Sequence, residues 1–314
     1  AEPSVAEFRL SMSGNIHLDA KRREEVLGGC DSDEMRAARD YGDFISESVR
    51  MYPAFNMDVH GAPYRTGDPR CSDFDRAIAD GRVPENWSRY MWVDPGYSTA
   101  GVLFAAVPPP SKFGDVLLIY DELAIRNCNA AMLAHEIDAK MTGHAFEAFI
   151  IDEHGSRVRD AATGMSIKEQ YTREFRRRNI RSARTGSGFL PGSDDREARS
   201  MMVRGALATD GNGHVRLRFL TGRLPHFEKA MRMYLRQKRG DGTIMDVAKP
   251  RNRHSHLPNC LEYGVASNPK YVSPEKSKPA PTATFLAFQE HMAEEQRRSG
   301  EKYVNLGPPK RVAI

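Results

Sequence analysis

Two aspartates end apolar runs of the sequence, and their type and position suggest chemistry. Asp94 closes the run RYMWVD, and Asp152 closes the run FEAFIID. Carboxylates at the ends of strands in one sheet can lie side by side, and paired carboxylates are ligands that Mg²⁺ and Mn²⁺ prefer. Each aspartate alone also fits an ordinary turn, because Asp94 precedes Pro-Gly and Asp152 precedes Glu-His-Gly. The pair therefore predicts either a divalent-metal site or two strand-ending turns.

The elements around these aspartates follow one another in an order that favours the metal site. Short apolar runs at 89–94, 100–107 and 116–125 predict three strands joined by turns, and hence an antiparallel start. Apolar residues at helical spacing then predict a helix over 130–141, and the run 146–152 predicts a fourth strand. This order resembles the RNase H-like nuclease core, an α/β fold in which helices flank a mixed central sheet.

The rest of the chain predicts further helices around this core. An N-terminal strand and turn precede a helix that begins after Asp19, and a second helix is expected over 32–41. Helices are also expected over 196–207, 224–237 and 258–266, with a strand over 215–220 and a loop in GSGFLPGSDD. We predict a linker segment at 1–86, a nuclease domain at 87–272, and a C-terminal tail with one helix at 273–314.

The composition excludes several classes of protein. No apolar run reaches the roughly 18 residues that a membrane span needs, and the N-terminus lacks the layout of a signal peptide. The four cysteines lie far apart without a CxxC pair, which argues against a zinc ribbon and a disulfide framework. The scattered cysteines fit a reducing compartment, and a mean hydropathy of −0.58 fits a soluble protein. The formal charge of +4 is too small to indicate a polyanion-binding protein by itself.

Basic residues gather in one segment, YTREFRRRNIRSAR. Six arginines are balanced there by Glu174 alone: Arg173, Arg176, Arg177, Arg178, Arg181 and Arg184. Arginine and lysine contacts with phosphates supply most of the sequence-independent affinity for DNA. The segment therefore predicts either a DNA-backbone contact or a solvated helix face.

An ordered set of motifs makes the resemblance more specific. FRLSMSGNIHLD, EMRAARDYGDF, MYPAFN, VPENWSRYMWVDPG, IYDEL, IIDEHG, FLPGSDDREA and HSHLPNCLEYG occur along the chain in this order. The set resembles the C-terminal nuclease domain of the large terminase subunit of tailed bacteriophages, the packaging ATPase-nuclease. No segment of the form GxxxxGK[ST] occurs, so we expect the nuclease domain with its linker and not the whole motor.

The last motif departs from the family at its third metal-ligand position. The resemblance implies an Asp where this chain has Asn259, while His256, Leu261 and Tyr263 fit. An Asn offers one neutral carbonyl oxygen and no charge, so it predicts weakened metal binding. Three explanations stay open: an inactivating substitution, a natural divergence, or compensation by Glu262 one helical turn later.

Several other residues are weaker candidates for the site. Glu122 and Asp121 lie in the third predicted strand and either approach the metals or solvate the strand end. His254 and His256 either orient a water or a phosphate or belong to a loop. Trp87 and Trp92 are expected in the core or at a domain interface.

The resemblance implies an endonuclease that cleaves concatemeric double-stranded DNA with two Mg²⁺ or Mn²⁺ ions. Asp94, Asp152 and position 259 would be the catalytic, metal-binding residues, and cutting would lack strict sequence preference. The implied partners are DNA, the portal protein, the small terminase subunit and the ATPase domain of the same full-length protein, with no membrane. The implied location is the bacterial host cytoplasm, at the packaging motor on the procapsid portal.

Two other functions fit parts of the sequence. Asn259 favours a catalytically dead module of the motor that grips DNA and docks on the portal. A free-standing RNase H-like nuclease or resolvase explains the two aspartates but leaves the first ninety or so residues unexplained.

Overall fold

The computed structural model describes residue 17 and residues 19–28, 50–96, 98–141, 143–161, 163–211, 213–238, 244–248 and 254–273. The first predicted strand, the helix predicted over 32–41 and the tail after 273 lie outside these residues. Helix α1 (Ala20–Gly28) begins after Asp19, as predicted, because the Asp19 carboxylate accepts a hydrogen bond from the Arg22 N–H at 2.7 Å. No described helix has the length and apolarity needed to cross a membrane.

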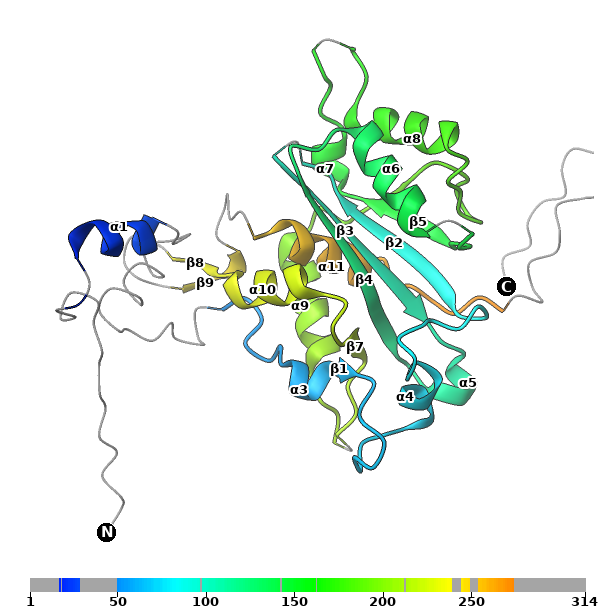
Figure 1. Ribbon diagram of the computed structural model, residues 1–314. Coiled ribbons are helices and arrows are strands. Elements are labelled where there is room, and N and C mark those ends of the chain that lie inside the picture. Colours follow the sequence, from blue (N-terminus) through cyan, green and yellow to red (C-terminus); the bar gives the residue numbers. More distant parts are fainter. Residues whose placement is uncertain are drawn as a thin grey trace, which may run out of the picture. The chain divides into compact units, whose positions relative to one another are not determined.

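A seven-stranded mixed sheet forms the centre of the fold, in the order β1-β7-β4-β3-β2-β5-β6 (Figure 1). Strands β2 (Ser88–Asp94), β3 (Thr99–Val107) and β4 (Leu117–Arg126) form the predicted antiparallel meander. Strand β5 (Ala148–Ile151) pairs in parallel with β2, and β6 (Leu190–Pro191) pairs in parallel with β5. The five strands β4-β3-β2-β5-β6 have the order of an RNase H-like sheet, which confirms the predicted fold class.

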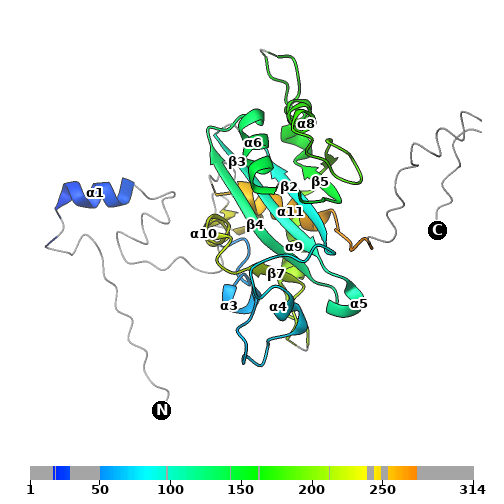
Figure 2. The same cartoon turned by 45° about the vertical axis from the view of Figure 1, so that its right-hand side comes forward.

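Helices cover both faces of this sheet (Figures 1 and 2). Helices α6 (Ala130–Met141) and α8 (Ile167–Arg177) pack on one face, and α9 (Arg196–Leu207), α10 (Pro225–Met233) and α11 (His256–Ala266) pack on the other. The two cores follow from side-chain alternation along each strand. In β2, Tyr90 and Trp92 face the second group of helices, whereas Met91 and Val93 face the first.

The segment before β2 also belongs to this sheet. Helix α3 (Met57–His60) leads into β1 (Gly61–Ala62), which pairs in parallel with β7 (Leu217–Leu220). Helix α4 (Asp73–Ala77) follows and carries a buried aspartate, Asp75, which forms an ion pair with Arg218 of β7 at 2.9 Å. The residues from 50 to 86 therefore add a strand and a buried ion pair to the sheet.

Most predicted elements occur, with differences at their ends. The helix predicted over 224–237 ends at Met233, because Tyr234 has an extended backbone and strand β8 (Arg236–Lys238) follows and pairs with β9 (Ile244–Ala248). Helix α11 begins two residues before Pro258, which lies in the first turn, where no helix hydrogen bond needs its N–H. The short elements α5 (Pro110–Phe113), α7 (Glu153–Ser156) and β6 were not predicted.

Candidate metal centre

The two strand-ending aspartates lie on adjacent parallel strands. Asp94 is the last residue of β2, and Asp152 directly follows β5 and donates its backbone N–H to the Val93 carbonyl at 3.2 Å. Asp94 is buried, and burial raises the pKa of its carboxyl group, with a further upward contribution from the nearby charge of Asp152. The structure thus brings both predicted carboxylates to one corner of the sheet.

Helix α11 brings three polar side chains to this corner. The His256 Nδ1 lies 3.0 Å from the Asp94 Oδ2, and the Asn259 Nδ2 donates to the same oxygen at 3.2 Å. The Tyr263 hydroxyl donates to the Asp152 Oδ1 at 2.8 Å. Positions 256, 259 and 263 lie on one face of a helix, so a single element contacts both carboxylates.

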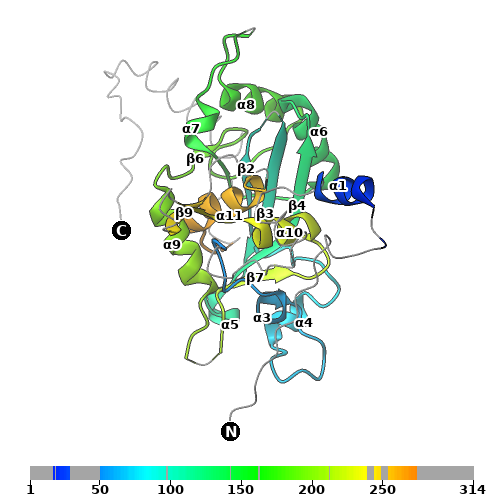
Figure 3. The same cartoon turned by 90° about the vertical axis from the view of Figure 1, so that its left-hand side faces the viewer.

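Close packing of α11 on the sheet depends on residues without side chains. A Cβ atom at Gly264 would lie 1.9 Å from the Trp92 ring, and one at Gly101 would lie 3.1 Å from the His256 Cβ. Gly264 lies on α11 and Gly101 on β3, so glycines of both elements allow the approach. Figure 3 shows α11 lying against β2 and β3. This approach sets the distance between Asn259 and Asp94.

Asn259 also contacts a buried polar network on its other side. Its Oδ1 accepts a hydrogen bond from the Tyr234 hydroxyl at 3.0 Å, and burial together with the charge of the nearby Glu262 raises the pKa of Tyr234. The Tyr52 hydroxyl donates to the Glu262 carboxylate at 2.5 Å, and the Arg199 Nε lies 3.6 Å from that carboxylate. Burial raises the pKa of Glu262, while the bond from Tyr52 and the charge of Arg199 oppose this shift.

The charges at this corner fit a divalent cation. Within the described residues, Asp94 forms an ion pair with His256 and none with Lys or Arg. A buried carboxylate next to a second carboxylate is costly unless a positive charge compensates it. The described part of the chain contains no metal-binding group of three His, Cys, Asp or Glu residues, and the third position here is the amide of Asn259. The two carboxylates are hard ligands of the kind that Mg²⁺ and Mn²⁺ take, whereas the Asn259 amide has its nitrogen toward Asp94.

A basic cleft opens beside the centre. It has a volume of about 430 Å³ and includes His256 in its wall. Arg126 at the end of β4 and Lys229 on α10 are exposed and line this cleft, as do His226 and His254. Sequence reasoning missed Arg126 and Lys229, because each is a single cation in an otherwise ordinary strand or helix. Their common position beside His256 arises only from the packing of α10 and β4.

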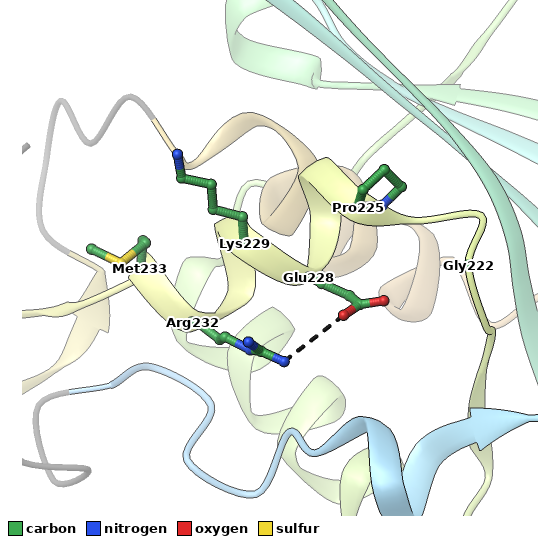
Figure 4. A pocket seen from close by; sticks show the side chains of 6 residues that line it. All are labelled: Gly222, Pro225, Glu228, Lys229, Arg232 and Met233. Carbon is green, nitrogen blue, oxygen red and sulfur yellow. Dashed lines mark ion pairs between the residues drawn. The ribbon is translucent and has the colours of Figure 1, made fainter. Parts of the chain in front are cut away.

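A second cleft, on the outer side of α10, does not include the aspartates (Figure 4). Glu228 and Arg232 of this helix form an ion pair at 3.8 Å there, one helical turn apart. Such a pair, with Arg232 exposed and Glu228 half-buried, is ordinary helix-surface chemistry. We therefore assign the candidate site to the corner of Asp94 and Asp152.

The arginine-rich segment lies on and after α8, which packs against α6 and contacts α7, the element after Asp152. Five of the six arginines are exposed and Arg178 is half-buried. Arg173 and Arg177 contact the buried Glu174, and Arg178 lies 3.7 Å from Asp138. The remaining three, Arg176, Arg181 and Arg184, form no ion pair with a described residue.

The weaker candidates have other partners. Glu122 accepts the backbone N–H groups of His226 and Phe227, each at 2.7 Å, at the start of α10. Asp121 forms an ion pair with Lys140 at 2.7 Å. Glu262 belongs to the network with Tyr52 and Arg199, whereas His256 contacts Asp94 directly.

Tyr234 is a contact of the site that sequence reasoning placed elsewhere. Tyr234 lies within the helix that the sequence predicted over 224–237, and it is buried. The residue lies just past the end of α10, and its hydroxyl reaches Asn259. No local signal distinguishes such a tyrosine from one that only fills the core.

Comparison with solved structures finds similar folds among phage proteins. The nuclease domain of the P22 large terminase has 11% sequence identity and a TM-score of 0.45, over 70% of this chain and 92% of that one. The fold is similar to that of large terminase nuclease domains. The SPP1 domain, solved with bound Mn, has 13% identity and a TM-score of 0.38, over 64% of this chain and 94% of that one. The nuclease of thermophilic phage G20c, solved with bound magnesium, has 10% identity and a TM-score of 0.41, over 70% of this chain and 97% of that one. No protein-family model and no curated protein sequence matches the chain.

Proposed function

We propose that this chain is a divalent-metal DNA endonuclease whose centre consists of Asp94, Asp152 and Asn259. The observation that carries the proposal is the placement of two carboxylates on adjacent parallel strands, one of them buried without a Lys or Arg partner among the described residues. The ordered motifs of the sequence agree with this function. In the packaging context that those motifs imply, the substrate is concatemeric viral DNA, and the portal, the small subunit and an ATPase domain are the partners.

Each residue of the centre has a separate task in this proposal. Asp94 and Asp152 would hold the cations, and Asn259 would contribute a neutral oxygen. His256 and Tyr263 fix the two carboxylates by the hydrogen bonds that they make to them. Divalent ions held there would supply the chemistry that activates a water and stabilises the leaving 3′ oxygen.

Basic side chains around the proposed metal centre would contact the DNA backbone. Arg126 and Lys229 line the cleft beside His256, and both are exposed. The arginines on and after α8, the helix that contacts α7, add positive charge from another element. Such contacts neutralise phosphates without reading bases, so we expect cleavage without strict sequence preference.

Nicking of supercoiled plasmid in the presence of Mn²⁺ tests the proposal. We expect the chain to nick the plasmid, and Asp94→Ala and Asp152→Ala to remove the activity. Asn259→Asp should increase the rate, because it adds a negative charge at the third ligand position. If neither the chain nor Asn259→Asp cleaves DNA, the nuclease function is wrong.

One observation favours a second function, the dead DNA-gripping and portal-docking module. The Asn259 Nδ2 donates to the carboxylate oxygen of Asp94, which a cation would otherwise take. This function predicts that only Asn259→Asp cleaves, while both proteins bind DNA equally well. The same nicking assay, together with a filter-binding assay on the uncut plasmid, separates the two functions.

A further inference from the structure

The side-chain amide of Asn259 lies between two hydrogen-bonding partners, Asp94 and Tyr234. One side faces the Asp94 Oδ2 at 3.2 Å and the other faces the Tyr234 hydroxyl at 3.0 Å. The oxygen and the nitrogen of an amide have nearly the same shape, so a half-turn of the group exchanges them. The structure has Nδ2 toward Asp94, and the exchanged arrangement has Oδ1 there. The partners of Tyr234 decide between the two arrangements.

Tyr234 has a single hydroxyl proton and two polar neighbours. Its hydroxyl donates to the Asn259 Oδ1 at 3.0 Å, and besides burial the charge of the nearby Glu262 carboxylate raises the pKa of Tyr234. An ionised carboxylate can only accept hydrogen bonds, and the Glu262 carboxylate has the Arg199 Nε at 3.6 Å and the Tyr52 hydroxyl at 2.5 Å. When Tyr234 donates its proton to Glu262, its oxygen can only accept from Asn259. The Nδ2 must then face Tyr234, and the Oδ1 faces Asp94.

When the Oδ1 of Asn259 faces Asp94, the amide oxygen lies next to a carboxylate oxygen, which is unfavourable by itself. A divalent cation bound between the two oxygens would make this arrangement favourable. We propose that Tyr234 and Glu262 are positioning residues that turn the Oδ1 of Asn259 toward the cation and so make Asn259 a neutral third ligand. This inference rests on the proposed metal centre. It assigns a task to a buried network that otherwise only fills the space between α9, α10 and α11.

Mn²⁺ affinity, measured by isothermal titration calorimetry, tests this inference with two matched variants. Tyr52 and Tyr234 are both almost fully buried beside Glu262, but of the two only Tyr234 contacts Asn259. Loss of a residue that orients a metal ligand typically lowers affinity by 10- to 100-fold. We expect Tyr234→Phe to weaken Mn²⁺ binding by about tenfold and Tyr52→Phe to leave it nearly unchanged.

A second variant changes the carboxylate that competes with Asn259 for the Tyr234 proton. Glu262→Gln has an amide nitrogen that can donate to the Tyr234 oxygen, which frees the Tyr234 proton for the Oδ1 of Asn259. The amide of Asn259 then turns its nitrogen toward Asp94. We expect Glu262→Gln to weaken Mn²⁺ binding as Tyr234→Phe does. Urea unfolding of each variant shows whether it is folded under the conditions of the titration.

The Asn259→Asp background distinguishes positioning from general packing. A carboxylate presents an oxygen to the cation in either orientation, so Tyr234→Phe should change Mn²⁺ affinity little in this background. Equal losses in Tyr52→Phe and Tyr234→Phe, or the same loss in both backgrounds, would overturn the inference. Binding of Mn²⁺ by Asn259→Asp but not by the unchanged chain would also overturn the inference. The proposed metal centre would still stand in that case. If neither background binds Mn²⁺, the proposed function fails together with the inference.

Discussion

Buried carboxylates near the proposed metal centre differ in what they contact, and their partners indicate their roles. Both carboxylate oxygens of Glu122 accept hydrogen bonds from backbone N–H groups at the start of α10, so these contacts serve the fold. Asp94 has its Oδ2 engaged by side chains and faces Asp152. The residue type alone did not separate these two cases in the sequence, whereas their contacts do.

Replacement of Glu122 tests this distinction at the residue scale. Glu122→Gln keeps one acceptor oxygen and leaves one buried N–H of α10 without its acceptor, so the free energy of unfolding should fall by about 1–3 kcal/mol. Urea unfolding measures this loss. Mn²⁺ affinity should stay unchanged, and a large decrease would mean that Glu122 belongs to the metal centre.

At the scale of elements, the centre depends on how closely α11 lies on the sheet. The periodicity of the sequence predicted β2 to β5 and the helices at 130–141 and 196–207, because each has a clear apolar pattern. It did not predict β1, since a two-residue strand has no pattern. It also did not predict the bond from Tyr52 to Glu262, which joins residues 210 positions apart. Contacts of this kind depend on the packing of whole elements.

Gly264 provides the test at this scale. A Cβ atom there would overlap the Trp92 ring, so Gly264→Ala should lower the free energy of unfolding by about 1–3 kcal/mol and weaken Mn²⁺ binding. Gly205→Ala on α9 is the matched control, because a Cβ there meets no atom within 4 Å. The control should stabilise the protein by about 0.5–1 kcal/mol. Equal effects of the two variants in urea unfolding would refute the packing argument.

At the scale of the whole molecule, the basic residues assigned to DNA binding come from separate elements. The arginines of the α8 segment and the cations of the cleft are on separate elements, and α4 lies at the other end of the view in Figure 1. The sequence predicted the arginine cluster because its members are neighbours in the chain. The cleft cations were not predictable, since they come together only in the fold.

Salt dependence of DNA binding tests the charge distribution. We expect the triple variant Arg176→Gln, Arg181→Gln and Arg184→Gln to reduce the slope of log affinity against log salt by about 0.9 for each phosphate contact that is lost. The loss should be similar for unrelated DNA sequences. The control with the same change in charge is Arg65→Gln, Arg70→Gln and Arg76→Gln, all exposed residues around α4. An equal reduction in both triple variants would show that net charge, not position, determines binding.

The central claim is that Asp94 and Asp152 form a divalent-metal centre with Asn259. A crystal structure of the chain grown with Mn²⁺ tests it most directly, because anomalous scattering locates this ion. We predict an anomalous peak bound by oxygens of Asp94 and Asp152 at about 2.0–2.3 Å, with the Oδ1 of Asn259 turned toward it. A structure at saturating Mn²⁺ with no peak at these carboxylates would contradict the claim.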